Sequence, residues 1–145
     1  MKTDELVGVS KKLRSDPYAS FVGAQLTRIE KGYAEAELMV ADYMLNFNKV
    51  AHGGATFSLA DVAFAAACNS FNQTAVALFF HIVYRKPVKV GTKLVAEAIE
   101  ESAGRKTALY RVTVRTSERR VVALCEGLAY KLDSKLAEED GPEAI

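Results

Sequence analysis

The fold is decided by the stretch NFNKVAHGGATFSLAD at residues 46–61, where a long apolar helix begins. Two glycines, Gly53 and Gly54, open this helix, and its apolar run extends to about Ser70. The only carboxylate inside the run is Asp61. Aspartate is a poor helix former away from a cap, and it is costly to bury unpaired. A carboxylate in apolar surroundings is typical of a catalytic base or nucleophile.

Length, composition and charge indicate the class of protein to which this helix belongs. The chain has 145 residues, half of them hydrophobic and 26% charged, which predicts a single globular domain over residues 1–145. The net charge of +1 gives no indication of a nucleic-acid or membrane partner. The N-terminus has no apolar signal core, and no uncharged run has the hydrophobicity of a membrane span over ~18 residues, because polar residues such as Asn69, Asn72 and Gln73 interrupt the most apolar stretch. Cys68 and Cys125 lie in apolar stretches, so we expect buried, reduced thiols and a cytoplasmic location.

Hydrophobic periodicity predicts an α+β fold. An amphipathic N-terminal helix is expected within residues 1–15, ended by Asp16-Pro17. Alternation predicts strands at 21–30, 33–40, 74–85, 92–100, 107–115 and 120–132, with the long helix between the second and the third. The acidic tail, 134–145, is expected to fray. One long helix among runs of strands favours an antiparallel sheet wrapped around that helix over an alternating βαβ sheet.

The strand predicted at 74–85 is apolar on both faces, with Phe80 on one face and Phe79 on the other. Such a strand is either central in a sheet or covered by another subunit. His81 lies on the same face as Phe79, and we expect a core or interface histidine there.

The combination of Asn46, His52-Gly53-Gly54 and Asp61 resembles the hotdog-fold thioesterases of the phenylacetate-degradation (PaaI-like) branch, which includes thioesterase superfamily member 2. The similarity extends from Asp16-Pro17-Tyr18 through Tyr130. It implies an antiparallel sheet of five or six strands curled around the central helix. It also implies a homodimer joined through the strand after the helix, often doubled to a homotetramer, with active sites between two subunits.

The resemblance assigns roles to four residues. The N–H of Gly53, at the positive end of the helix dipole, would stabilise the oxyanion of a tetrahedral intermediate. Asp61 would be the general base or the nucleophile; the simpler alternative is a buried aspartate bonded to the backbone or to Thr56. Asn46 would hold the attacking water or the thioester, or simply form a turn. His52 would contact the substrate carbonyl, orient the loop or begin the helix. Because Gly53 and Asp61 lie ~12 Å apart along the helix, a partner subunit is expected to complete the site.

The implied substrate is an aryl-acetyl or medium-chain acyl-coenzyme A, so coenzyme A enters as substrate and no separate cofactor is expected. Gly104-Arg105-Lys106-Thr107 matches the family hairpin that contacts coenzyme A. Gly54, Arg85 and Lys86 are further substrate-binding candidates, with Lys89 nearby. All of these cations are also typical of a solvated surface. The expected acyl-pocket residues, which core packing would explain equally, are Phe57, Phe64, Phe79 and Phe80.

Other reaction classes find less support in the sequence. Two histidines without ligand spacing predict no metal site, and the serine elbow G-x-S-x-G is absent. A hotdog acyl-CoA dehydratase and a non-catalytic acyl-CoA-binding module remain as alternatives. The spacing of His52-Gly53 and Asp61 favours a thioesterase over the dehydratase, and the presence of both Asn46 and Asp61 speaks against the binding module. One departure from the family is Ala77, where some relatives carry a serine or threonine that positions water.

Overall fold

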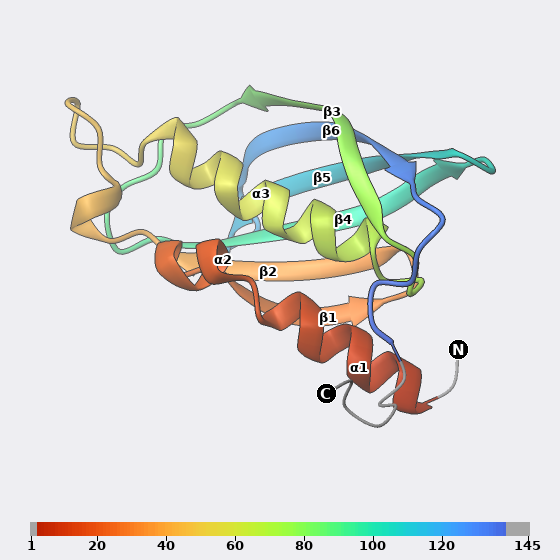
Figure 1. Ribbon diagram of the computed structural model, residues 1–145. Coiled ribbons are helices and arrows are strands. Elements are labelled where there is room, and N and C mark those ends of the chain that lie inside the picture. Colours follow the sequence, from red (N-terminus) through yellow and green to blue (C-terminus); the bar gives the residue numbers. More distant parts are fainter. Residues whose placement is uncertain (1–2, 139–145) are drawn as a thin grey trace.

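The computed structural model describes residues 3–138 and shows one six-stranded antiparallel sheet around a central helix (Figure 1). The strand order is β1-β2-β4-β5-β6-β3. The strands are β1 (Gln25–Glu30), β2 (Tyr33–Met39), β3 (Ala75–Tyr84), β4 (Lys93–Ala103), β5 (Thr107–Thr116) and β6 (Val121–Lys131). The long helix α3 (Gly53–Cys68) contacts all six strands. The predicted α+β architecture, with the sheet wrapped around one long helix, is therefore confirmed.

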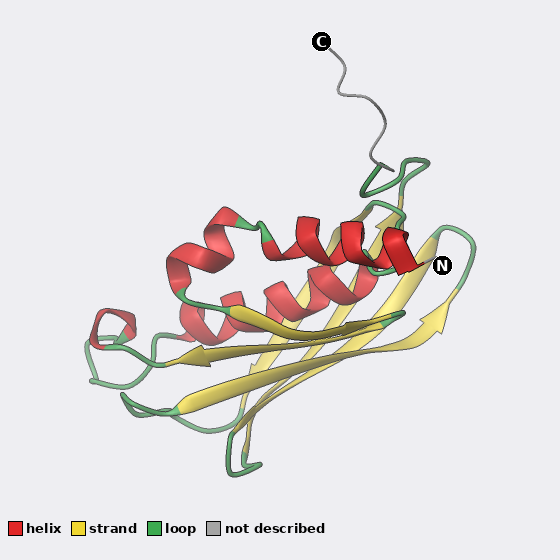
Figure 2. Ribbon diagram, turned by 90° about the horizontal axis from the view of Figure 1, so that it is seen from below, coloured by secondary structure: helices red, strands yellow, loops and turns green. Residues whose placement is uncertain are grey.

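Two shorter helices, α1 (Thr3–Arg14) and α2 (Pro17–Val22), lie on the same side of the sheet as α3 (Figure 2). The prediction that the first strand begins at Phe21 was wrong, because Phe21 belongs to α2 and β1 begins only after this helix. The Asp16 carboxylate accepts the N–H of Tyr18 at 3.0 Å, and Pro17 occupies the first helical position. This cap and proline start the helix, and Gly23 ends it with a φ of +83°.

The core lies between α3 and the side of the sheet that faces it. Every second residue of a strand points its side chain into this core. Its fully buried strand residues include Ala34, Ala36, Leu38, Leu94, Ala96, Ala98, Tyr110, Val112 and Val114. The helix approaches β6 so closely that a Cβ on Gly127 would lie 2.7 Å from Phe64 and 2.8 Å from Phe80. Only glycine fits at this position without displacing those rings.

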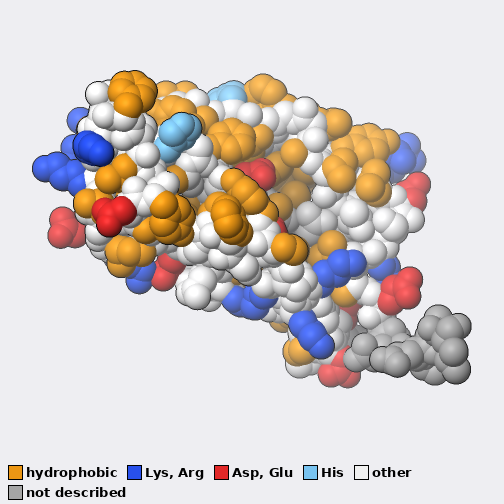
Figure 3. All heavy atoms as spheres, turned by 60° about the vertical axis from the view of Figure 1, so that its left-hand side comes forward, with side chains coloured by type: hydrophobic (Ala, Val, Ile, Leu, Met, Phe, Trp, Pro, Cys, Tyr) orange, Lys and Arg blue, Asp and Glu red, His pale blue; other side chains and the backbone are white. Residues whose placement is uncertain are grey.

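Strand β3 is an edge strand that pairs with β6 alone. The alternative that it is central in the sheet is excluded, because its outer edge has no partner within residues 3–138. Leu78, Phe79 and Val83 are 59%, 47% and 48% exposed. His81 is also exposed, so of the predicted core or interface positions only an interface position remains. Figure 3 shows hydrophobic side chains gathered along the upper part of the molecule, where Figure 1 places β3.

The start of the predicted frayed tail is attached to the segment between α3 and β3. The N–H of Thr74 donates to the carbonyl of Ser134 at 2.8 Å, and the N–H of Ala137 donates to Asn72 Oδ1 at 2.9 Å. The tail is thus held as far as Ala137. Its remainder, residues 139–145, and residues 1–2 of the predicted N-terminal helix lie outside the described residues. No helix in the described part of the chain is long and apolar enough to cross a membrane.

Candidate active site

The beginning of α3 is held in place by backbone hydrogen bonds from the loop before it. The N–H of Ala51 donates to the carbonyl of Val88 at 2.7 Å, and the N–H of His52 donates to the carbonyl of Met44 at 2.7 Å. The first bond joins the loop before α3 to the segment that follows β3, and the second joins His52 to Met44 earlier in the same loop. The first turn of α3 is therefore fixed relative to the end of the sheet.

The two glycines at this helix start differ in what their N–H groups bind. His52 is the N-cap residue, and its Nδ1 accepts the N–H of Gly54 at 2.8 Å. The N–H of Gly53 has no acceptor among the described residues. First-turn N–H groups without a partner bind anions, assisted by the helix dipole. Of the two glycines, Gly53 is therefore the one whose N–H remains available to a ligand.

Tyr84, at the end of β3, lies against Gly53, and sequence reasoning did not identify it as a site residue. Its Oη donates to the carbonyl of Gly53 at 2.9 Å. A hollow of about 300 Å³ opens here, lined in part by Gly53, Thr56, Tyr84, Arg85 and Lys86. The structure thus brings Arg85 and Lys86 to the Gly53 end of the helix.

Asp61 is half-buried in α3, two turns beyond Gly53. Burial raises the pKa of its carboxyl above the ordinary aspartate value, and the nearby Asp16 carboxylate raises the pKa further. Within residues 3–138 the carboxylate has no hydrogen-bond donor and no ion pair, so the bond to Thr56 or to the backbone considered from the sequence is not formed. An acid with a raised pKa and open lone pairs is suited to accept a proton or to attack a carbon atom.

The face of α3 that carries Asp61 is turned toward α2. One turn earlier on this face, the Ser58 hydroxyl donates to the carbonyl of Gly54 at 2.7 Å and lies 2.8 Å from Tyr18 Oη on α2. Gly53 instead opens toward the hollow beside Tyr84. At ~1.5 Å per residue the two groups are also ~12 Å apart along the helix axis. A single chain therefore does not place the Asp61 carboxylate beside the Gly53 N–H.

Asn46 lies in the loop before α3 and bonds to its own loop. Its Oδ1 accepts the N–H of Asn48 at 2.9 Å and the N–H of Val50 at 3.4 Å, which is the geometry of a turn-forming asparagine. The side-chain amide Nδ2 has no acceptor in the part of the chain that the structure describes. That N–H₂ group is the part of Asn46 left for a ligand.

The hairpin Gly104–Thr107 connects β4 to β5 at the other end of the sheet from the loop after β3. The N–H of Gly104 donates to the carbonyl of Thr107 at 2.8 Å, and Lys131 Nζ donates to the carbonyl of Gly104 at 2.8 Å. One chain thus does not bring the predicted coenzyme A hairpin to the Gly53 hollow.

Three of the four predicted acyl-pocket phenylalanines cluster between α3 and β3. The Phe80 ring centroid lies 5.2 Å from those of Phe57 and Phe64. Phe79 lies on the other face of β3, where its ring contacts His81 at 5.1 Å. An acyl chain entering between helix and strand would meet Phe57 and Phe80 before the fully buried Phe64.

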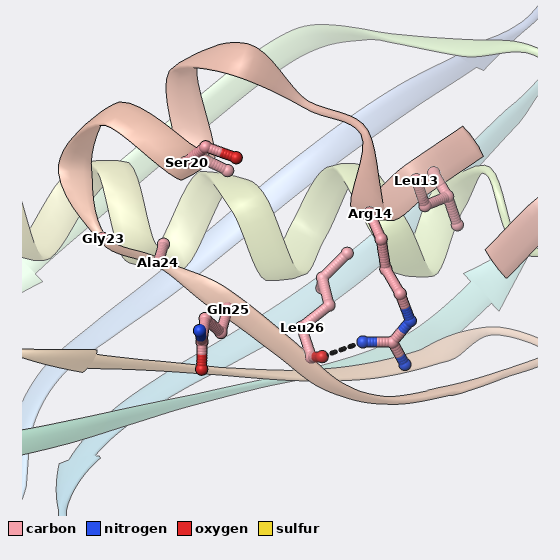
Figure 4. Close-up of a pocket in the computed structure, with 8 residues that line it drawn as sticks. Leu13, Arg14, Ser20, Gly23, Ala24, Gln25 and Leu26 are labelled. Atoms are coloured by element: carbon pink, nitrogen blue, oxygen red, sulfur yellow. Dashed lines mark hydrogen bonds between the residues drawn. The ribbon is translucent and has the colours of Figure 1, made fainter. Parts of the chain in front are cut away.

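A separate hollow of about 450 Å³ lies between α1, α2 and β1 (Figure 4). Its cation, Arg14, donates to the carbonyl of Leu26 and to Ser10 Oγ, so this side chain ties α1 to β1. None of the predicted site residues lines this hollow. The residues that line this hollow do not form a catalytic arrangement.

The remaining chemistry-bearing residues are structural. Cys68 and Cys125 are buried and unbridged, as predicted, and burial raises the pKa of each thiol to about 12. Such thiols are inert as nucleophiles at neutral pH. Over residues 3–138, no three His, Cys, Asp or Glu side chains gather into a metal-binding group.

Comparison with known proteins shows the family of the chain. Residues 48–123, which include α3 and four of the six strands in whole or part, match the family model described as the thioesterase superfamily. The chain belongs to the thioesterase superfamily. The acyl-coenzyme A thioesterase PaaI of Escherichia coli is 33% identical to it over 86% of this chain and 89% of PaaI. An Archaeoglobus fulgidus protein described as a candidate esterase is 40% identical over 83% of this chain and 78% of that protein.

Solved structures extend the comparison to the fold. The Escherichia coli PaaI protein matches this PaaI-like thioesterase superfamily member with a TM-score of 0.86 and 30% identity, over 91% of this chain and 96% of PaaI. A Streptococcus mutans protein, smu.793, solved bound to acetyl-CoA, matches with a TM-score of 0.73 and 28% identity, over 77% of this chain and 90% of that one. The predicted hotdog fold and the PaaI-like relationship are thereby confirmed.

Proposed function

We propose that this thioesterase superfamily member is an acyl-coenzyme A thioesterase that hydrolyses an aryl-acetyl or medium-chain acyl-CoA to the free acid and coenzyme A. The observation that carries the proposal is the unpaired N–H of Gly53 at the open start of α3, beside Arg85 and Lys86. PaaI and the acetyl-CoA-bound relative support coenzyme A as the carrier of the acyl group.

Gly53 supplies the electrophilic part of the site. When water attacks the thioester carbonyl, the oxygen gains negative charge, and a preorganised N–H stabilises this charge more than it stabilises the neutral ground state. The His52 side chain holds the Gly54 N–H, and Tyr84 holds the Gly53 carbonyl. These two bonds keep the Gly53 N–H aimed outward without consuming it.

Asp61 supplies the second part, either as general base or as nucleophile. As a base, it takes a proton from water while the new C–O bond forms, and that proton later passes to the departing thiolate as the C–S bond breaks. As a nucleophile, its carboxylate attacks the thioester carbon, the C–S bond breaks, and the coenzyme A thiolate leaves and takes a proton from water; a second water then hydrolyses the acyl-enzyme anhydride to the free acid and the Asp61 carboxylate. Its raised pKa makes the ionised carboxylate a better proton acceptor in the first course and a better nucleophile in the second. The free Nδ2 of Asn46 would hold the water or the thioester carbonyl.

A second copy of the chain completes this site in our proposal. Asp61 faces α2 while the Gly53 N–H opens beside Tyr84, so each chain offers two half-sites. The outer edge of β3 presents exposed apolar residues and unpaired backbone groups, which pairing with another β3 would cover. We further propose that two such homodimers associate into a homotetramer. The hairpin Gly104–Thr107 could contact coenzyme A only from such a neighbouring subunit.

The test is release of free thiol from a panel of acyl-CoA thioesters, including phenylacetyl-CoA and straight chains of increasing length. We expect hydrolysis with a preference for the aryl-acetyl or medium-chain members. A water adduct across an enoyl-CoA without thiol release would identify a dehydratase. Tight acyl-CoA binding without turnover of any member would identify a binding module. Either result would overturn the proposed activity.

A further inference from the structure

Within residues 3–138, one side-chain hydrogen bond joins α2 to α3. Tyr18 Oη lies 2.8 Å from Ser58 Oγ, and the Ser58 hydroxyl donates to the carbonyl of Gly54 at 2.7 Å. A serine hydroxyl has a single hydrogen, which here goes to the Gly54 carbonyl, so Tyr18 is the donor in its bond to Ser58. The phenol thus begins a chain of two hydrogen bonds that runs from α2 to the first turn of α3.

Other contacts hold α2 only loosely. The helix has six residues, too few for a helix to be stable by itself. Ala19 is buried and Val22 packs against the core, whereas the Phe21 side chain is 79% exposed. The helix also borders the hollow of about 450 Å³ that Figure 4 shows, so this side of α2 is not tightly packed. The hydrogen bond from Tyr18 is therefore important for keeping α2 against α3.

The part of α3 that α2 covers is the half-site of Asp61. Ser58 and Asp61 are three residues apart in α3, so both lie on the face that is turned toward α2. The Asp16 carboxylate caps α2 by accepting the N–H groups of Tyr18 and Ala19 at 3.0 and 3.1 Å. Its negative charge adds to burial in raising the pKa of Asp61. Helix α2 therefore brings both a covering surface and a like charge to this carboxylate.

The other elements around Asp61 bring no further charge to bear on it within the described chain. The sheet faces α3 with apolar side chains and with Tyr110, whose phenol donates to Glu100 at 2.9 Å. Cys68, further along α3, stays neutral because burial raises the pKa of its thiol to about 12. Asp16 is the charged group that affects the pKa of Asp61, and its position is fixed by the α2 cap.

We propose that Tyr18 is a positioning residue for thioester hydrolysis, whose hydrogen bond to Ser58 keeps α2 over Asp61. The inference rests on the proposed function. A carboxylate that is shielded from water and lies near another negative charge binds protons more tightly, so it is a stronger base or nucleophile than a solvated one. When α2 moves away, water reaches the carboxylate and weakens it. Tyr18 acts through Asp61 and does not touch the reacting atoms.

Three substitutions separate the hydrogen bond from the charge. Tyr18→Phe removes the phenol oxygen and keeps the ring. Asp16→Asn keeps a capping oxygen but removes the negative charge, so α2 should stay in its position. Tyr43→Phe is the matched control, because Tyr43 lies on the 3₁₀ turn η1 (Asp42–Met44), is 70% exposed, and makes no side-chain hydrogen bond within the described residues. Circular dichroism and thermal unfolding check that all three variants fold.

The readout is the pH dependence of kcat/KM for one acyl-CoA. We expect Tyr18→Phe to lower kcat/KM at the high-pH plateau by about tenfold, mainly through kcat, because the base is weaker and less well positioned. The inflection of the profile should move to lower pH. Asp16→Asn should move the inflection in the same direction, since losing a nearby negative charge lowers the pKa of Asp61. Tyr43→Phe should change neither quantity.

A purely structural role for Tyr18 predicts a different profile. Partial loss of folded protein would lower kcat/KM by the same factor at every pH and leave the inflection where it is. That result for Tyr18→Phe would overturn the inference, as would kinetics equal to those of the unaltered chain. A shift in Asp16→Asn without a shift in Tyr18→Phe would also overturn it, because the charge would then act without help from the phenol.

A titration of the Asp61 carboxyl by carbon-13 NMR needs no turnover and so separates this inference from the proposed activity. Tyr18→Phe should move the Asp61 midpoint to lower pH. The double variant Tyr18→Phe, Ser58→Ala should move it no further, because both changes remove the same bond. A shifted midpoint without thiol release from any acyl-CoA would retain the hold of Tyr18 on α2 and remove the enzyme. Thiol release with an unshifted midpoint would retain the enzyme and overturn the inference.

Discussion

The phenol of Tyr84 donates a hydrogen bond of 2.9 Å to the carbonyl of Gly53, which fastens the edge strand β3 to the first residue of α3. The ring lies so close that a Cβ added to Gly53 would be 3.1 Å from it. The Gly53 φ is not in the left-handed region, so the space beside Tyr84, and not backbone conformation, requires glycine here. Whatever displaces this ring also disturbs the N–H that we assign to the oxyanion.

Gly53→Ala should lower kcat by about a hundredfold, because losing a well-aimed oxyanion donor typically has an effect of ~10²–10³. The double variant Gly53→Ala, Tyr84→Ala opens space for the methyl group and should recover part of this loss. Steady-state kinetics of the two single variants and the double variant provide the measurement. If Gly53→Ala turns over like the unaltered enzyme, the steric requirement and the oxyanion assignment are both wrong.

Asp61→Asn should abolish thioester hydrolysis while the fold stays intact, with a loss of at least ~10² in rate. In the unaltered enzyme, the ionised carboxylate does the work, so kcat/KM should fall as the pH is lowered through the pKa of Asp61. Because that pKa is raised by burial, the inflection should lie above the ordinary aspartate value. A pH–rate profile checks this, and an inflection that persists in residual Asp61→Asn activity would point to another group.

The same substitution should stabilise the fold at pH 7. A carboxyl with a raised pKa in the folded chain favours folding only while protonated, and this contribution is lost as the pH rises through the folded-state pKa. Asparagine removes the ionised group, so Asp61→Asn should have the higher Tm at pH 7. The difference in Tm should shrink at acidic pH. Equal Tm values at both pH values would show that Asp61 is well solvated in the working enzyme.

His52→Ala should destabilise the chain by about 1 kcal/mol, because it removes the side-chain cap of α3. His52→Asn keeps a capping acceptor and should retain most of the stability, which makes it the matched control. Urea unfolding of both variants measures the free energy of unfolding. If alanine is tolerated as well as asparagine, the Gly54 N–H finds water or another acceptor at no cost.

Shared sites can be tested by mixing two inactive variants, Asp61→Asn and Gly53→Pro. Proline suits the first position of a helix but lacks the N–H, so it should remove the oxyanion donor, and its Cβ would also press against Tyr84. Subunit exchange should restore about one working site per mixed dimer. Confirmed exchange of labelled subunits without recovery would show that each site is built within one chain.

Gly127→Ala should destabilise the fold by ~1–3 kcal/mol, because the new methyl group overpacks the contact with Phe64 and Phe80. Gly8→Ala, within α1, is the control, because the nearest atom to the added Cβ would be 3.8 Å away. That change should stabilise by ~0.5–1 kcal/mol through lower unfolded-state entropy. Thermal unfolding distinguishes the two signs, and equal destabilisation by both changes would contradict the packing argument.

Much of the fold followed from local periodicity. The alternation Ala34, Ala36, Leu38 placed one face of β2 in the core, and the alanine-rich run after Gly53 gave the long helix. The helix α2 was missed, although Asp16-Pro17 is itself a start signal for a helix. The apolar residues from Phe21 to Glu30 are consistent with a single strand, because a six-residue helix is too short to show the 3.6-residue periodicity of a helix.

Two groups that the site can use are evident from the order of residues alone: a glycine pair at a helix start and one carboxylate in an apolar helix. These follow from spacing along the chain, which folding does not change. Three further features required the folded chain: the Gly53 N–H is the open donor, Asp61 faces α2, and β3 is an edge strand. Those outcomes depend on contacts between residues far apart in the chain, such as the 31 positions between Gly53 and Tyr84. Strand order and side-chain direction are set by packing over the whole domain, so no local pattern could fix them.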